Sequence, residues 1–240
     1  MLAVGACQAE LGELDSAFYN GDGRRVHCAV GVDTDTHNSL ASIDTALDRA
    51  AERAETVELY AHVPGRTVPV SVLEYVVAGA SARGLAFVTY ADFARNEGRG
   101  PAIALSLDDS SIAEWFALRS LFQTYSARVT LFLSHYQLLT SDELAMLSEL
   151  AADGHDIAAH SVWHYRAPEY VEQAGLTTYL NDEVLPSIDR LRAAGYDVTS
   201  FAYPFGARTS ELDHAILQRV PIVRSIVFSY TGIVTSPCPD

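Results

Sequence analysis

Two adjacent carboxylates end a largely apolar stretch near the middle of the chain. Residues 103–107 form a short apolar run, and Asp108 and Asp109 follow it directly. The run is short and precedes a segment with helical spacing, so we predict a buried strand. Burying a carboxylate without a partner costs several kcal/mol, which argues against a packing role for this pair. Taken alone, the pair also fits a solvated turn in which an Asp caps the next helix.

Two histidines follow a second short apolar segment. Residues 156–159 are predicted to form a strand that leads into His160 and, four residues later, His164. The i, i+4 spacing would place both imidazoles on one side of a helical turn. Two imidazoles and one carboxylate, with open positions for water, are typical of catalytic zinc sites and would leave a second carboxylate free to act as a base. By itself the spacing is a weak pattern, because two ordinary histidines produce it more often.

Polar or turn-forming residues follow two further predicted strands. His62 comes directly after the strand 56–61, and a Pro-containing turn ends the strand 198–203. In that turn Pro204 fixes φ and Gly206 lets the backbone approach a ligand closely, although ordinary loops use the same residues. The carboxyl ends of parallel strands lie at one face, where active sites are built. We therefore expect the four strand ends to form one site.

Strands and helices alternate along the rest of the chain, which indicates an α/β fold with parallel strands in one sheet or barrel. Residues 25–240 are predicted to form one such domain, and residues 1–24, which are polar and Gly-rich from residue 8, a tether. The expected strands are 26–32, 56–61, 85–90, 103–107, 129–133, 156–159, 198–203 and 222–229. The expected helices are 39–54, 70–83, 112–125, 141–153 and 210–219, with one long or two shorter helices within 168–194.

Composition excludes several classes of partner. Of the 240 residues 49% are hydrophobic, which suits one globular domain. The chain has 16 basic and 31 acidic residues, a formal charge of -15, which argues against nucleic acid and anionic membrane surfaces as partners. No apolar run reaches the length of a membrane-spanning helix.

The three cysteines indicate the cellular compartment in which the protein is expected. Residues 1–7 resemble the end of a bacterial lipoprotein signal, in which the cysteine, here Cys7, is acylated after cleavage, although a charged region and a full apolar region are missing. An ordinary N-terminal segment is the alternative. A lipid anchor at Cys7 would be the one membrane contact and would place the protein outside the cytoplasm, in the periplasm or at the cell surface. Cys28 and Cys238 would then be paired as a disulfide, with two free thiols as the alternative.

Taken together, these motifs resemble those of the NodB-type polysaccharide deacetylases, carbohydrate esterase family 4. The likeness spans residues 101 to about 230 and covers three motifs in order. The family's T-F-D-D-G, H-S/T-x-x-H and R-x-P-Y/F-G correspond here to Ser106-Leu107-Asp108-Asp109-Ser110, His160-Ser161-Val162-Trp163-His164 and Ala202-Tyr203-Pro204-Phe205-Gly206.

The resemblance implies a distorted (β/α) barrel of seven or eight strands and the hydrolytic removal of acetyl groups from a polysaccharide of the N-acetylglucosamine type. It implies one divalent metal ion, most simply zinc, held by Asp109, His160 and His164, with Asp108 as the general base. The turn of Tyr203, Pro204 and Phe205 would face the substrate, and the backbone N–H of Phe205 would help to hold the oxyanion. Two positions depart from the family: Ser110 replaces a Gly, and Ala202 replaces the Arg that holds the base.

The family's late L-x-H motif, which supplies a catalytic histidine, has no counterpart after Gly206. A similar segment, Leu59-Tyr60-Ala61-His62, lies near the start instead. We therefore expect a circularly permuted domain in which residues 101–240 correspond to the family's N-terminal part and residues 25–95 to its C-terminal part. His62 would be the general acid, and segments 26–32 and 222–229 would be barrel neighbours. The alternative is that His62 is an ordinary loop histidine.

Two other functions fit the same motifs. One is the removal of O-acetyl groups from a xylan-type polysaccharide by the same residues. The other is a carbohydrate-binding relative that kept the fold and lost turnover, a reading to which Ala202 gives some weight. Retention of the three metal ligands and the base argues against the second alternative.

Overall fold

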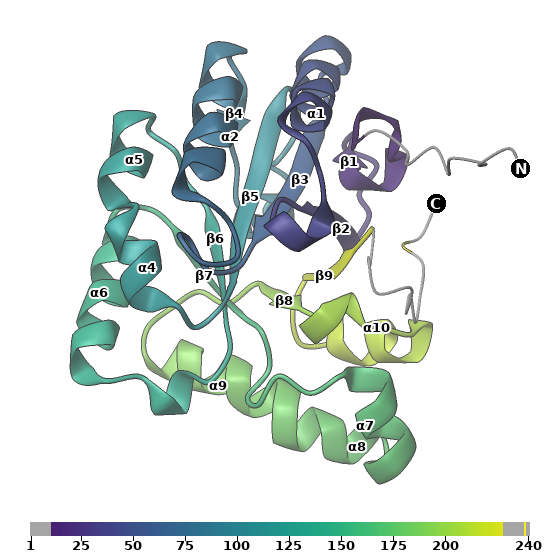
Figure 1. Cartoon of the computed structure of the whole chain (residues 1–240). Coiled ribbons are helices and arrows are strands. Elements are labelled where there is room, and N and C mark those ends of the chain that lie inside the picture. Colours follow the sequence, from purple (N-terminus) through teal and green to yellow (C-terminus); the bar gives the residue numbers. More distant parts are fainter. Residues whose placement is uncertain (1–10, 228–237, 239–240) are drawn as a thin grey trace, which may run out of the picture.

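Seven parallel strands close into a barrel in the computed structural model, which describes residues 11–227 and 238. Around the barrel the order is β2, β9, β8, β7, β6, β5 and β3, and β3 pairs with β2 to complete the ring. The predicted (β/α) barrel is thus confirmed (Figure 1). The strands are β2 (Val26–Gly31), β3 (Thr56–Ala61), β5 (Ala102–Asp109), β6 (Thr130–Leu133), β7 (Asp156–Ala159), β8 (Ser200–Ala202) and β9 (Ile222–Ile226).

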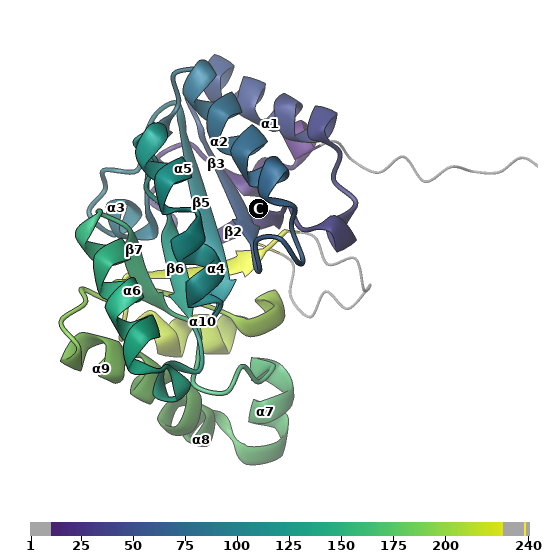
Figure 2. The same cartoon turned by 60° about the vertical axis from the view of Figure 1, so that its left-hand side comes forward.

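Helices cover the outside of the barrel, and Figure 2 shows α1 and α2 side by side over β3 and β5. Ser39 caps α1 by accepting a hydrogen bond from the N–H of Ser42, and Thr140 and Glu143 form a capping box at the start of α6. The outer helices are α1 (Leu40–Arg53), α2 (Val70–Ala82), α4 (Ile112–Ala117), α5 (Arg119–Thr124), α6 (Ser141–Ala152), α7 (Ala167–Ala174), α8 (Leu176–Tyr179), α9 (Leu185–Ala193) and α10 (Ser210–Ile216).

The strand expected at 85–90 is shorter than predicted. Only Ala86 and Phe87 form β4 (Ala86–Phe87), which pairs with β5. Thr89 and Asp92 make a capping box that starts the short helix α3 (Tyr90–Ala94), so the capping interaction ends the strand early. α3 lies at the amino end of β6, where the N–H of Tyr90 donates to the hydroxyl of Thr130.

The barrel separates two buried clusters. Alternate strand residues pack outward against the helices, for example Ile103, Leu105 and Leu107 of β5. The inner cluster is built from small strand residues, which include Ala104, Ala158 and Ala202, around the rings of Tyr90 and Phe132. The small inner residues leave room below the carboxyl ends of the strands for larger polar side chains.

Residues 11–19 do not form a tether, which corrects the prediction for this part of the N-terminal segment. Leu11 and Phe18 are almost fully buried and belong to the outer cluster. β1 (Phe18–Tyr19) pairs in antiparallel fashion with β3. The apolar side chains of this segment pack beside α1 and β3. The free energy gained by burying them holds the segment against the barrel, although many neighbouring residues in the sequence are polar. Cys7 and the rest of residues 1–10 lie outside the described residues.

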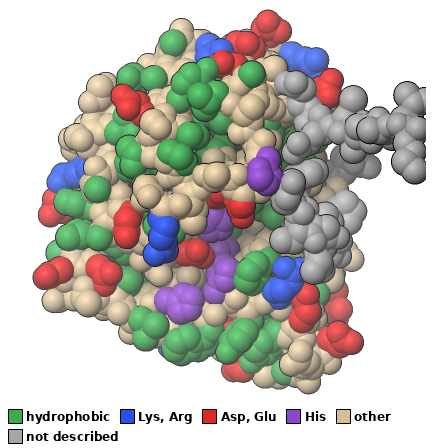
Figure 3. Space-filling model, viewed as in Figure 1, with side chains coloured by type: hydrophobic (Ala, Val, Ile, Leu, Met, Phe, Trp, Pro, Cys, Tyr) green, Lys and Arg blue, Asp and Glu red, His purple; other side chains and the backbone are tan. Residues whose placement is uncertain are grey.

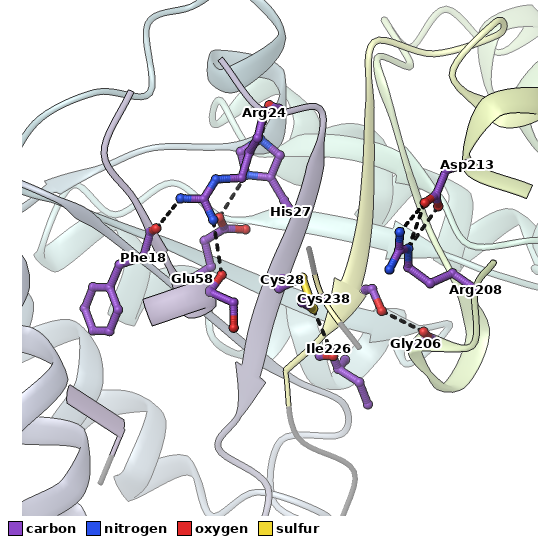
Figure 4. Close-up of a disulfide and its surroundings, with 12 residues drawn as sticks. Phe18, Arg24, His27, Cys28, Glu58, Gly206, Arg208, Asp213, Ile226 and Cys238 are labelled. Atoms are coloured by element: carbon purple, nitrogen blue, oxygen red, sulfur yellow. Dashed lines mark hydrogen bonds and ion pairs between the residues drawn. A yellow bond between two sulfur atoms is a disulfide. The ribbon is translucent and has the colours of Figure 1, made fainter. Parts of the chain in front are cut away.

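A disulfide joins Cys28 of β2 to Cys238, and their Cα atoms lie 6.2 Å apart (Figure 4). It lies where β2 and β9 pair, because Cys28 is opposite Ser225 in the ladder and the sulfur of Cys238 is 3.2 Å from the carbonyl oxygen of Ile226. The predicted adjacency of segments 26–32 and 222–229 is therefore confirmed as far as Val227, the last described residue of the second segment. Within residues 11–227, no helix combines the length and the apolar character that crossing a membrane requires.

Candidate active site

The structure brings the four predicted strand ends together around one cavity of about 270 Å³ at the carboxyl ends of the barrel strands. Figure 3 shows histidine and acidic side chains gathered in a hollow on this face, with hydrophobic side chains along its lower border. The lining residues include all the predicted polar positions and several that sequence reasoning missed: Asp33, Asp35, Tyr60, His62, Asp108, Asp109, His160, His164, Arg166, Phe205 and Arg224.

Asp109, His160 and His164 converge as a set of metal-ligating groups. One ligand atom from each lies within 4.8 Å of the others. Nε2 of His164 is 3.2 Å from Oδ1 of Asp109 and 3.2 Å from Nε2 of His160, while Nε2 of His160 is 3.8 Å from the same carboxylate oxygen. Two imidazoles and one carboxylate that face a common point beside a cavity match the donor set of a divalent transition-metal site with open positions.

The orientation and charge of His160 fit a metal ligand. Its Nδ1–H donates to the carbonyl oxygen of Ala202 at 2.9 Å, which leaves the lone pair of Nε2 directed toward Asp109 and His164. Burial, and then the charge of His164, hold the pKa of His160 well below its usual range. Burial also lowers the pKa of His164, against the opposing charges of Asp109 and Asp108. Both imidazoles are thus neutral near pH 7 and available for a metal ion.

The two histidines are not on a helical turn, so that prediction is wrong. Residues 160–164 form an irregular loop, in which Ser161 has a φ of 66° and His164 a φ of 62°. These left-handed residues fold the loop back so that both imidazoles meet. The N–H of His164 donates to the hydroxyl of Ser161 at 2.9 Å, and the N–H of Trp163 donates to the carboxylate of Glu183 at 2.8 Å.

Glu183 supports this loop from beneath and was not predicted. It is 1% exposed and lies on the π-helical turn Leu180–Val184, between α8 and α9. Burial raises its pKa, which the N–H of Trp163 partly offsets. A single acidic residue within a helical segment gave no sequence signal, because its partner is 20 residues away on another element.

Asp108 is buried beside the cationic side chain of Arg224. Its Oδ2 is hydrogen bonded to the guanidinium of Arg224, and Asp108 and Arg224 are 2% and 1% exposed. Oδ1 of Asp108 has no hydrogen-bond partner among the described residues. One oxygen of the carboxylate is therefore held by the protein, and the other is left for a group that enters the cavity.

Arg224 comes from β9, next to the strand on which the family motif has its Arg. Ala202 of β8 is directly opposite Arg224 in the parallel ladder. Because Ala202 is small, the guanidinium of Arg224 occupies the barrel interior, 5.2 Å from the ring centre of Tyr60 and 4.9 Å from that of Phe132. A charged residue in the largely apolar strand 222–226 was the signal that could have identified it.

His62 faces the same cavity and is paired with Asp33. Its Nδ1–H donates to the carboxylate of Asp33 at 2.6 Å, and the hydroxyl of Thr67 donates to the other oxygen of Asp33. Burial lowers the pKa of His62, but the hydrogen bond to Asp33 and the charge of Asp108 raise it further, to about 9. The contacts with His62 and Thr67 lower the pKa of Asp33 against its burial. His62 is therefore protonated at neutral pH.

The residues after β8 form the turn that Pro204 and Gly206 predicted, and its left-handed conformation was not predicted. Phe205 and Gly206 have φ angles of 59° and 63°. A Cβ on Gly206 would lie 2.3 Å from the side chain of Ile226, so only glycine fits there. Within the described chain, the N–H of Phe205 has no hydrogen-bond acceptor, and Phe205 lines the cavity.

Tyr203 and Pro204 support the turn from behind. Both are buried, and the hydroxyl of Tyr203 donates to Asp213 at 2.9 Å. Arg208 binds the same carboxylate (Figure 4). The side chain of Tyr203 thus anchors the turn and also lines the cavity, whereas Phe205 is the exposed member of the turn.

Comparison with known proteins gives a family and a fold. Residues 95–220 match the family model described as Polysaccharide deacetylase, and no curated protein matches the sequence significantly. Protein BA0330 of Bacillus anthracis superposes with a TM-score of 0.59 at 15% identity, over 71% of this chain and 57% of that chain. This chain therefore matches less than two thirds of the length of BA0330.

Two further solved structures share the fold. IcaB from Ammonifex degensii gives a TM-score of 0.58 at 15% identity, over 75% of this chain and 94% of that one. The Streptococcus pyogenes deacetylase PplD, in complex with acetate, gives a TM-score of 0.54 at 18% identity, over 67% of this chain and 78% of that one. These likenesses show a common architecture, and the family model covers more than half of the sequence. On that match, the chain belongs to the polysaccharide deacetylase family.

Proposed function

We propose that this protein is a metal-dependent deacetylase that removes acetyl groups from an N-acetylated polysaccharide of the N-acetylglucosamine type. The observation that carries the proposal is one cavity with three kinds of group: a metal-ligand triad, a buried carboxylate with one free oxygen, and a protonated histidine. Hydrolysis of an amide needs a group that accepts a proton from water and a group that donates one to the leaving amine. We assign these two tasks to Asp108 and His62, which line the same cavity.

Asp109, His160 and His164 would hold one divalent ion, which we propose to be zinc. Their nitrogen and oxygen donors suit zinc, although other divalent ions accept the same set. When bound, the ion would polarise the acetyl carbonyl and lower the pKa of a water molecule. The neutral imidazoles and the hydrogen bond from His160 to Ala202 support this role, because a ligand histidine needs one nitrogen fixed and the other free.

Asp108 would act as the general base. Its oxygen Oδ1, which has no partner among the described residues, would accept a proton from the attacking water, while Arg224 holds Oδ2. The N–H of Phe205 would donate to the carbonyl oxygen as negative charge develops there. Support for this role is that the N–H of Phe205 has no acceptor within the described chain.

His62 would act as the general acid. With Nδ1–H committed to Asp33, the proton on Nε2 is the one available to the leaving nitrogen. As the bond between the acetyl carbon and nitrogen breaks, the amine takes this proton, and water supplies the hydroxyl group of acetic acid. The products are acetate and a free amino sugar. Asp108 gains one proton from water and His62 gives one to the amine, so transfer of one proton from Asp108 to His62 through solvent restores both side chains.

We also propose that the domain is circularly permuted relative to the family's usual order, with 25–95 corresponding to its C-terminal part and 101–240 to its N-terminal part. Support comes from the match of residues 95–220 alone to the family model, while β2 and β3, with Asp33 and His62, complete the barrel from the other end of the chain. Superposition on a family member of the usual order should pair β2 and β3 with that protein's last strands. Pairing with its first strands would refute the permutation.

The proposed location is outside the cytoplasm, in the periplasm or at the cell surface. The disulfide between Cys28 and Cys238 supports it, because such bonds persist in oxidising compartments. The partner would be an acetylated polysaccharide, and no nucleic acid. The lipid anchor at Cys7 stays a prediction, since Cys7 lies outside the described residues.

Acetate release from a panel of substrates tests the function. We expect the protein with its metal to release acetate from N-acetylglucosamine oligomers and the Asp108→Asn variant to lose about 10²–10⁴-fold in rate while keeping its metal. Release from acetylated xylan alone would replace the proposal with the O-acetyl esterase alternative. Binding of oligomers without any release would favour the inactive carbohydrate-binding alternative, against which the pairing of Arg224 with Asp108 argues.

A further inference from the structure

The turn that carries the N–H of Phe205 is tied to strand β9 on both sides of that residue. Before Phe205, the N–H of Tyr203 donates to the carbonyl oxygen of Arg224 at 2.9 Å. After Phe205, the hydroxyl of Ser225 donates to the carbonyl oxygen of Gly206 at 2.6 Å, a contact drawn in Figure 4. Two consecutive residues of β9 therefore hold the turn.

Ser225 is fully buried and does not line the cavity. Its neighbours Arg224 and Ile226 do line it, as expected from the alternation of side chains along a strand. The strand is fixed at this point, because Cys28 of the disulfide lies opposite Ser225 in the ladder between β2 and β9. Any effect of the Ser225 hydroxyl on the reaction must therefore pass through the turn.

Hydrogen bonds link the Ser225 hydroxyl to the Phe205 N–H through two peptide units. The C=O of Gly206, which accepts from Ser225, shares a peptide unit with the N–H of Ala207. That N–H donates to the carbonyl oxygen of Pro204 at 3.1 Å, and the C=O of Pro204 shares a peptide unit with the N–H of Phe205. All the donors of this chain point the same way, and its last group is the N–H that has no acceptor within the described residues.

Such a chain has two effects on the N–H of Phe205. The peptide units of this turn are trans and therefore planar, with C=O and N–H pointing in opposite directions, so holding the C=O of Pro204 also sets the direction of that N–H. Hydrogen bonds in series polarise one another, which makes the last N–H a stronger donor. Donors held in advance near the atom where negative charge develops contribute strongly to the catalysis of acyl transfer.

We propose that Ser225 is a positioning residue that directs and polarises the N–H of Phe205 toward the acetyl oxygen. This inference rests on the proposed function, in which that N–H donates to the oxyanion. It adds a residue that lies outside the cavity and acts on the transition state through the backbone of the turn. Because the oxyanion forms only during the reaction, Ser225 should affect turnover and leave substrate binding unchanged.

Kinetics of Ser225→Ala test the chain by removing its first donor. We expect kcat for an N-acetylglucosamine tetramer to fall roughly 3- to 30-fold with KM unchanged, less than the about 10²–10³-fold that follows when an oxyanion donor itself is removed. The matched control is Thr56→Val, which removes another fully buried hydroxyl from a carbonyl oxygen, that of Gly98, at the amino end of β3. The control should keep the wild-type kcat. An unchanged kcat in Ser225→Ala would overturn the proposal.

Amide NMR spectra test the chain without turnover. In Ser225→Ala the amide proton resonance of Phe205 should move upfield, because its peptide unit is less polarised, whereas in Thr56→Val it should not move. In the wild-type protein, the amide proton of Ala207 should exchange with solvent much more slowly than that of Phe205, a measurement that needs no variant to fold. Equally fast exchange of these two protons would show that the chain is absent and would overturn the proposal.

The two proposals fail in different ways. If the wild-type protein releases no acetate, the proposed function fails, and the amide resonances still show whether Ser225 controls the N–H of Phe205. If acetate is released but the Phe205 resonance is the same in Ser225→Ala as in the wild type, the role of Ser225 is refuted and the proposed function stands. Thermal unfolding of each variant checks that it is folded as the wild type is.

Discussion

Replacing Arg224 with Met gives the most direct test of how the base is held. Met has a similar length and no charge, so it fills most of the space between the rings of Tyr60 and Phe132 and removes the partner of Asp108. The change leaves a carboxylate that is 2% exposed without its cation. It must then stay buried as an unpaired anion or take up a proton, and a protonated carboxyl cannot accept one from water.

The size of the effect follows from burial. Removing one partner of a buried ion pair costs about 3–5 kcal/mol, since the other charge stays uncompensated. For a chain of this length, 1 kcal/mol corresponds to a change in melting temperature of about 2–4 °C, so the variant should melt roughly 6–20 °C lower. Arg83→Met is the matched control because Arg83 pairs with partly exposed Asp44 and Asp48, and such pairs are worth about 0–1 kcal/mol.

Urea unfolding and acetate release on the same samples measure both consequences. Arg224→Met should lose most of its turnover and keep its bound metal. The double variant with Asp108→Asn should recover part of the lost stability, because it no longer buries an unpaired charge, while activity stays low. If Arg224→Met unfolds within 1 kcal/mol of the wild type and keeps its kcat/KM, the ion pair neither stabilises the barrel nor holds the base.

Three further predictions address other parts of the site and the fold. As general acid, His62 should lose its proton as pH rises through about 9, so kcat/KM should fall there. Asp33→Asn should move this fall to lower pH, because the hydrogen bond to Asp33 raises the pKa of His62. A fall at the same pH in the variant would argue against the pairing of His62 with Asp33. The same raised pKa stabilises the fold fully below pH 6.5, a contribution lost as pH rises through about 9. His160→Ala should reduce the metal content measured by elemental analysis, whereas unchanged content would refute the ligand assignment. The unfolded, unreduced protein should show no titratable thiol from Cys28 or Cys238, and replacing both with Ser should lower the unfolding free energy by about 2–5 kcal/mol.

The residues that perform the proposed chemistry could be found in the sequence because each group is local. Asp108 and Asp109 are neighbours, and His160 and His164 are four residues apart, so short motifs with recognisable residue types identify them. The alternation of strands and helices predicted the barrel, and parallel strands place their carboxyl ends at one face. That rule also brought distant His62 to the same cavity.

The environment that controls those residues was decided only by tertiary structure. Asp108 and Arg224 are 116 positions apart, and their contact depends on β8 and β9 being neighbours and on Ala202 being small. Glu183 contacts the loop of residues 160–164 from a helical segment. This loop has left-handed residues where a helical turn was expected.

The N-terminal segment is a further case in which the sequence alone did not predict burial. Its composition indicated a tether, yet Leu11 and Phe18 are buried because α1 and β3 offer an apolar groove that composition does not reveal. Residue types and short spacings are properties of the chain and can be read locally. Partners, burial and backbone handedness depend on which distant segments the closed barrel brings together, and only the folded structure fixes those.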